Sequence, residues 1–138
     1  MRIRRILFVL IVIGLLVIGG GYCLNLSPGL VDQDHPDVVT RAAIEAIGTM
    51  DAESVTAYFT PLPSRSMSAR LNTTFNYYDS IEISGLTTRI ALDDGVAAQV
   101  RADYDMIVTK DGNQNIQHCS KVIKLVQIDG KWWINEAF

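Results

Sequence analysis

The sequence has few of the residues that build metal centres or disulfide-rich folds. Its 138 residues include only two cysteines and two histidines, so a zinc site would lack an adequate set of ligands. His118 and Cys119 are adjacent in a predicted strand, where neighbouring side chains leave opposite faces, so they cannot form a nucleophile and base pair. Asp32, Asp34 and Asp37 are too few and too irregular for a calcium loop. We therefore predict no metal and no cofactor.

Basic residues are scarce beyond the first five positions. The formal net charge is −3 at pH 7, and Arg2, Arg4 and Arg5 contribute +3, so the rest of the chain carries −6. A surface with that excess of acids repels phosphate groups. We therefore expect neither nucleic acid nor anionic lipid headgroups as partners.

A long apolar run follows the N-terminal arginines. Residues 6–24 contain no charged side chain, and about 19 residues of helix span roughly 28 Å, close to the thickness of a bilayer core. The arginines should stay in the cytoplasm, so we predict that residues 1–24 form an Arg cluster and a single-pass membrane anchor, with residues 6–24 in lipid and the rest outside the cytoplasm. A second interpretation stays open, because Gly19 and Gly21 provide the small residues of a signal cleavage site, and cleavage near Gly21 would give a secreted protein.

The chain beyond the anchor has the length of one domain. Residues 25–33 mix Ser, Pro, Gly and Asp without a period, which indicates a tether, and residues 34–138 are predicted to form an extracytoplasmic α+β domain. Apolar residues at spacings of three and four predict a helix from Pro36 to Met50. Asp34 should cap this helix, and Pro36 suits its first turn.

Two more helices are predicted before the strands begin. Asp51 should cap a short helix that carries Tyr58 and Phe59 on one side. Pro61 stops it, since proline restricts the residue before it. A third short helix should begin at Ser64.

From Tyr77 onward the apolar period changes to two, which is typical of strands. Ile81 and Ile83 share one face, but beyond Gly85 the apolar positions change parity. An extra residue at Ser84-Gly85 would cause this change, so we predict a β-bulge there. The residues that carry the changed parity are Leu86, Ile90 and Leu92.

Three short turns divide the rest of the sequence into strands. The strand from Val96 to Val108 alternates most regularly, with apolar residues on one face and polar residues on the other. The closing strand should run from Lys131 to Phe138. The turns lie at Asp93–Gly95, Lys110–Asn113 and Asp129–Gly130. The predicted fold is therefore α+β, with two or three helices packed on a bent four-stranded antiparallel meander.

This arrangement resembles the cystatin-like, nuclear-transport-factor-2-like superfamily, in which a bent sheet wraps around N-terminal helices to make a cone. Small membrane-tethered members include lumazine-binding-like domains of unknown function. The resemblance covers residues 34–138, and the superfold hosts enzymes, ligand binders and assembly scaffolds alike. The features that carry it are the helices Pro36–Met50 and Asp51–Phe59, the Thr60-Pro61 pair, the bulge at Gly85 and the ending Asp129-Gly130-Lys131-Trp132-Trp133-Ile134.

The resemblance implies that any ligand site lies inside the cone. Isomerases and dehydratases of the superfamily use an acid there, and the candidate base here is Asp79. Tyr77 also lies where the sheet begins and is a candidate for the rim of such a pocket. Strand alternation places Asp103 and Asp105 on the wet face, away from such a site. The candidate residues for an apolar pocket are Tyr58, Phe59, Tyr104 and Met106.

A partner contact is predicted on the other face of the sheet. Trp132 and Trp133 project to opposite faces, and we expect Trp133 to lie outside, beside Ile123 and Leu125, where it would meet another protein or a second copy. The leading hypothesis is a membrane-anchored, non-enzymatic binding or assembly module. The alternatives are a carrier of a small apolar ligand and, last, an isomerase or hydratase that uses a pocket acid.

Overall fold

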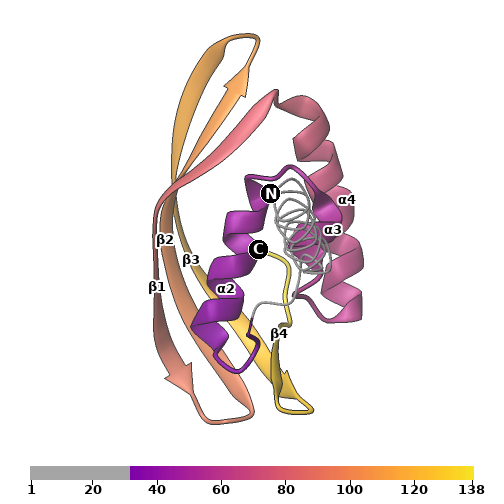
Figure 1. Cartoon of the computed structure of the whole chain (residues 1–138), viewed down its shortest axis with the longest axis vertical. Coiled ribbons are helices and arrows are strands. Elements are labelled where there is room, and N and C mark those ends of the chain that lie inside the picture. Colours follow the sequence, from indigo (N-terminus) through magenta and orange to yellow (C-terminus); the bar gives the residue numbers. More distant parts are fainter. Residues whose placement is uncertain (1–31) are drawn as a thin grey trace, which may run out of the picture. The chain divides into compact units, whose positions relative to one another are not determined.

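The computed structural model describes residues 32–138, which form three helices followed by four strands. The strands make one antiparallel sheet in chain order. All three helices cover the same face of this sheet, and the long strands bend around them (Figure 1). The predicted α+β architecture is confirmed. The elements are α2 (Pro36–Ile47), α3 (Ala52–Thr56), α4 (Pro61–Tyr77), β1 (Ser80–Asp93), β2 (Ala97–Lys110), β3 (Asn113–Ile128) and β4 (Lys131–Ile134).

The predicted membrane anchor, its lipid contact through residues 6–24 and the cleavage site near Gly21 lie outside the described residues and stay predictions. Among residues 32–138, no helix has both the length and the apolar character to cross a membrane. The last residue of the predicted tether is attached to the domain. The backbone N–H of Trp132 donates to the Gln33 carbonyl at 2.9 Å, and the Gln33 amide donates back to the Trp132 carbonyl at 3.2 Å.

Helix α2 begins at Pro36, as expected, but its N-cap residue is His35 and no side chain caps it, so the role predicted for Asp34 is wrong. The Asp34 N–H instead donates to its neighbour Asp32 at 2.9 Å. The helix ends at Ile47, three residues before the predicted end. Met50 adopts a φ of 56°, a left-handed conformation that cannot continue a right-handed helix.

Helices α3 and α4 divide the chain differently from the prediction. Asp51 caps α3 by accepting from the Glu53 N–H, as expected, but the helix stops at Thr56, before Tyr58 and Phe59. Helix α4 begins at Pro61 rather than Ser64 and has 17 residues. Proline is tolerated in a first turn, where its missing N–H has no helical partner, so Pro61 starts a helix instead of only ending one.

The predicted bulge in β1 is present. Ser84 pairs with Asp105 and Thr87 with Asp103, so two residues of β1 lie opposite one residue of β2. Gly85 has a φ of +62°, which suits glycine. A second, unpredicted register shift lies between Ile90 and Leu92. Leu92 pairs with Gln99 and is 51% exposed, so the prediction that Leu92 continues the apolar face of this strand is wrong.

The side of the sheet that faces the helices is here called the inner face. Strand β2 alternates as predicted, with Ala98, Val100 and Ala102 almost fully buried on it. Strand β4 ends at Ile134 rather than Phe138. The chain then turns back over the core, where the Phe138 ring stacks on that of Phe59 with ring centres 5.5 Å apart.

Candidate functional site

A cleft of about 270 Å³ opens between α4 and the inner face of β2 and β3. Helix α4 presents one face to it through residues spaced three and four apart, which lie together on a helix. We call this the inner cleft. It is lined by Ile47, Met67, Arg70, Leu71, Thr74, Phe75, Tyr104, Met106, Gln117, Cys119, Lys121 and Phe138.

Tyr104 and Cys119 form the floor of the inner cleft. They are directly opposite each other in the register of β2 and β3. Burial is the main cause that raises the pKa of Tyr104 well above its ordinary value of 10, and the neighbouring Cys119 thiol adds to it. Tyr104 is thus a protonated hydrogen-bond donor at physiological pH. Cys119 is a free cysteine whose thiol lies 3.7 Å from the Gln117 carbonyl oxygen.

The charges at the inner cleft have one sign. Arg70 and Lys121 line it, and no aspartate or glutamate of the described residues does. The polar neutral groups are the Thr74 hydroxyl and the Gln117 amide, beside the phenol and the thiol of the floor. Groups of this kind can orient a ligand by hydrogen bonding, and no carboxylate of the described residues lines the cleft for proton transfer.

The structure brings two of the four predicted pocket residues to the inner cleft. Tyr104 and Met106 line it, as their place in β2 predicted. Tyr58 and Phe59 do not, because they follow the end of α3 and pair with β4: the Ile134 N–H donates to the Tyr58 carbonyl at 2.8 Å. Both side chains are buried in the core, at 4% and 5% exposure.

Tyr77 and Asp79 lie away from the inner cleft. Tyr77 is 54% exposed, and the Lys110 ammonium lies 3.9 Å from the centre of its ring. Asp79 is exposed and accepts a hydrogen bond of 2.7 Å from the Asp111 N–H, in the turn between β2 and β3. The placement of Asp79 as a pocket acid is therefore wrong. Its carboxylate ties a turn to the start of the sheet.

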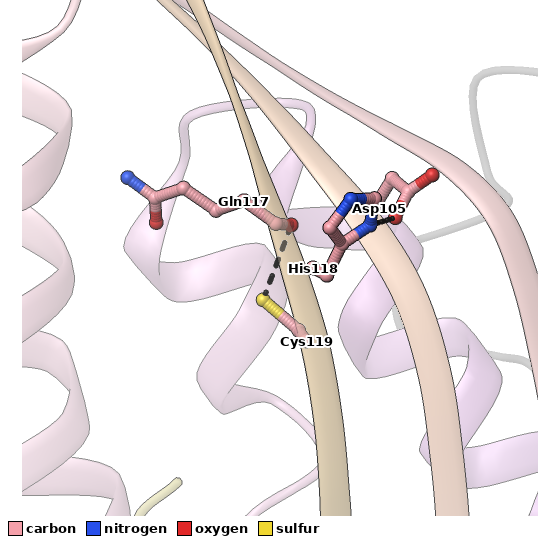
Figure 2. Close-up of polar contacts among 4 residues, drawn as sticks. All are labelled: Asp105, Gln117, His118 and Cys119. Carbon is pink, nitrogen blue, oxygen red and sulfur yellow. Dashed lines mark hydrogen bonds and ion pairs between the residues drawn. The ribbon is translucent and has the colours of Figure 1, made fainter.

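The outer face of the sheet carries Asp103 and Asp105, as alternation predicted, and each is paired with a polar side chain of β3. Asp105 contacts the His118 ring, and the Ser120 hydroxyl donates to Asp103 at 2.5 Å. Figure 2 shows His118 turned toward Asp105, while Cys119 points away from this pair. The side chains of adjacent residues in β3 thus leave opposite faces, and His118 and Cys119 do not form a catalytic pair.

The predicted grouping around Trp133 is wrong in two of its three residues. Ile123 and Leu125 are 0% and 1% exposed and belong to the core. In the register of β3 and β4, Trp133 pairs with Val126 and Ile134 with Leu125, so Trp133 lies on the opposite face. Trp133 is half-buried and borders a hollow of about 480 Å³ with Phe59, Thr60, Pro61, Ile128, Asp129 and Lys131.

Sequence reasoning missed the wall of the cleft that α4 provides. The sequence predicts a short helix from Ser64, but its pattern does not by itself connect Arg70, Thr74 and Phe75 with a ligand site. The spacing of Met67, Leu71 and Phe75 was the available signal, since residues four apart share a helix face. Lys121 carried no signal, because a lysine in a strand is ordinarily solvated.

Comparison with known proteins supports the fold. The chain matches no protein-family model and no curated protein. Solved structures do match, including a protein of Novosphingobium aromaticivorans named for an aromatic ring hydroxylase, with 15% identity, a TM-score of 0.62, and coverage of 72% of this chain and 83% of that one. Aln2 from a Streptomyces species has 11% identity and a TM-score of 0.59, and the match covers 72% of this chain and 82% of Aln2. A protein named for scytalone dehydratase, also from N. aromaticivorans, has 15% identity and a TM-score of 0.56, and the match covers 70% of this chain and 74% of that one.

These neighbours have the scytalone dehydratase-like, nuclear-transport-factor-2-like fold, which confirms the resemblance at the level of the fold. At such identities the similarity extends to the fold alone. Proteins named for enzymes occur among the neighbours, so the fold accommodates small-molecule sites. The chemistry of this chain must come from its own residues.

Proposed function

We propose that residues 32–138 form a non-enzymatic binding module that holds a small, largely apolar ligand in the inner cleft. The observation that carries this proposal is the lining of the cleft. Six of its twelve lining residues are apolar, and the phenol of Tyr104 provides a polar group at its floor. The apolar residues are Ile47, Met67, Leu71, Phe75, Met106 and Phe138. Apolar walls with a few converging polar groups are the usual form of a small-molecule site.

Acid and base catalysis is the less suitable function for this cleft. Proton transfer near neutral pH needs a group whose pKa lies close to the working pH. Burial moves the pKa of Tyr104 in the wrong direction for a base. The candidate carboxylates are elsewhere, since Asp79 holds a turn and Asp103 bonds Ser120 on the outer face. The proposal therefore follows the carrier hypothesis rather than the isomerase hypothesis.

The proposal places this module outside the cytoplasm, tethered to the membrane through residues 6–24. The apolar length of that segment and the preceding arginines support this part of the proposal. A membrane tether would hold the binding site close to amphiphilic molecules that leave or enter the bilayer. Fractionation of cells into soluble and membrane material tests the location independently of the ligand.

Binding of the neutral fluorescent probe phenylnaphthylamine to the full chain tests the proposed cleft. Cys119→Phe places a ring on the floor of the cleft and should weaken probe binding by about tenfold or more, because packed interiors accommodate added volume poorly. Val122→Phe puts the same ring on the outer face of β3, where Val122 is 42% exposed, and should leave binding unchanged. Residues 6–24 are present in all three proteins, so probe bound to that segment is the same in each.

The proposal fails if Cys119→Phe binds the probe as tightly as the unmodified chain. Circular dichroism and thermal melting of both variants show whether the fold is kept. If Cys119→Phe does not fold, Gln117→Trp gives a second obstruction from the rim of the same cleft.

Assembly through the outer face is a second candidate function. Ile107 and Ile116 pair across β2 and β3 on that face, and Ile116 is 57% exposed. Apolar side chains among polar ones on a sheet are typical of a weak protein contact. Ile116→Glu would then lower the mass of any oligomer seen by sedimentation of the full chain, and an unchanged mass would exclude this surface.

A further inference from the structure

The inner cleft carries a charge opposite to that of the domain around it. The chain beyond the N-terminal arginines has a net charge of −6, yet the two charged residues that line this cleft, Arg70 and Lys121, are both cations. They come from different elements, one from α4 and one from β3. Both walls of the cleft therefore contribute positive charge at the rim.

Arg70 and Lys121 are not used in ion pairs within the described part of the chain. The ion pairs found there are Arg41 with Glu45, Lys124 with Glu136 and His118 with Asp105. Lys121 is opposite Ala102 in the register of β2 and β3, so its side chain leaves the inner face toward α4 rather than the outer face that holds the acids. The two cations thus remain available to a ligand.

We infer that the ligand carries an anionic group, a carboxylate in the simplest case, on a short apolar body. This inference rests on the proposed binding function of the inner cleft. The apolar body would lie against Leu71, Phe75 and Met106, and the anionic group would meet the guanidinium of Arg70 and the ammonium of Lys121. Charge-assisted hydrogen bonds of this kind are stronger than those between neutral groups.

The volume of the cleft limits the apolar body. Sites for drug-sized ligands begin at about 300 Å³, so a cleft of about 270 Å³ takes a smaller molecule or only part of a longer one. The cations lie at the exposed rim, whereas Tyr104 at the floor is 7% exposed. This arrangement suits an amphiphile that enters with its apolar end first and leaves its charged end at the surface.

Displacement of phenylnaphthylamine by decanoate and by decanol tests the inference. The two molecules have the same chain length and differ in charge. An ionised carboxylate is more strongly hydrated than a hydroxyl, so apolar contact alone predicts that decanol binds more tightly. We expect the reverse in the full chain, with decanoate displacing the probe at a concentration about tenfold lower, and we expect salt to reduce this preference.

Charge-neutral variants assign the preference to the two cations. The double variant Arg70→Gln and Lys121→Gln should lose the preference for decanoate over decanol. Arg65→Gln is the matched control, since Arg65 is exposed on α4 and does not line the cleft, and it should keep the preference. If the unmodified chain binds the probe but prefers decanol, the inference is overturned while the binding function stands. If it binds neither the probe nor the two amphiphiles, the proposed function fails and the inference fails with it.

Discussion

Tyr104 on β2 and Cys119 on β3 lie directly opposite each other on the inner face of the sheet, at the floor of the inner cleft that α4 closes with its buried face. The bulge of β1 lies beside this pair. Regular pairing would put Gly85 on the inner face there, but the extra residue puts Leu86 against the core instead. The site is therefore made by long-range packing of α4 on the paired strands β2 and β3, and Ile47 of α2 and Phe138 complete its lining.

The raised pKa of Tyr104 predicts how stability depends on pH. The folded protein holds the phenol proton more strongly than the unfolded chain, so this contribution to stability is complete below the ordinary value of about 10 and is lost as the pH rises above it. We expect the free energy of unfolding in urea to fall above about pH 10. Tyr104→Phe should make the fall smaller, whereas Tyr77→Phe, at a residue 54% exposed, should leave it in place.

The bulge of β1 predicts a graded response at Gly85. Its φ is +62°, and an added Cβ would meet no atom within 4 Å. A side chain at this position would therefore destabilise the fold through backbone strain and not through a clash with neighbouring atoms. We expect Gly85→Val to destabilise the fold by about 2 kcal/mol and Gly85→Asn by less, because asparagine tolerates the left-handed region. Equal losses for both variants in urea unfolding would contradict the conformational explanation.

The placement of Asp79 predicts a stability effect without a binding effect. Asp79→Ala removes the acceptor of the Asp111 N–H and should cost about 1 kcal/mol, since the bond is exposed and uncharged on the donor side. Probe binding to the inner cleft should stay the same. A loss of binding that exceeds the loss of stability would return Asp79 to the list of site residues.

The register of β3 predicts opposite results at two adjacent residues. Ile123 is fully buried, so Ile123→Ala should destabilise the domain by about 3 kcal/mol. Val122→Ala, at a side chain 42% exposed on the other face, should change the free energy of unfolding by less than about 0.5 kcal/mol. A larger loss for Val122→Ala than for Ile123→Ala would mean that the register is shifted by one residue, because such a shift exchanges the faces.

The α+β class, the alternation of β2 and the bulge at Gly85 were predictable from the sequence, because each depends on a local period or a local backbone preference. The same local reasoning separated His118 from Cys119, since adjacent strand residues always leave opposite faces. It was less successful at the ends of elements. Pro61 starts α4 although proline also ends helices, and the choice depends on whether the chain that follows can pack.

Half of the predicted pocket also followed from the sequence, since the alternation of β2 turned Tyr104 and Met106 inward. The partners of these residues did not follow. Arg70 and Lys121 are 51 positions apart in the sequence, and only the packing of α4 on the inner face of β3 brings them to one cleft. Ile123 and Trp133 lie on opposite faces of the sheet because of the register between β3 and β4. Alternation within either strand alone does not define that register. Periodicity specifies which face of an element is apolar, whereas the tertiary structure decides which elements meet.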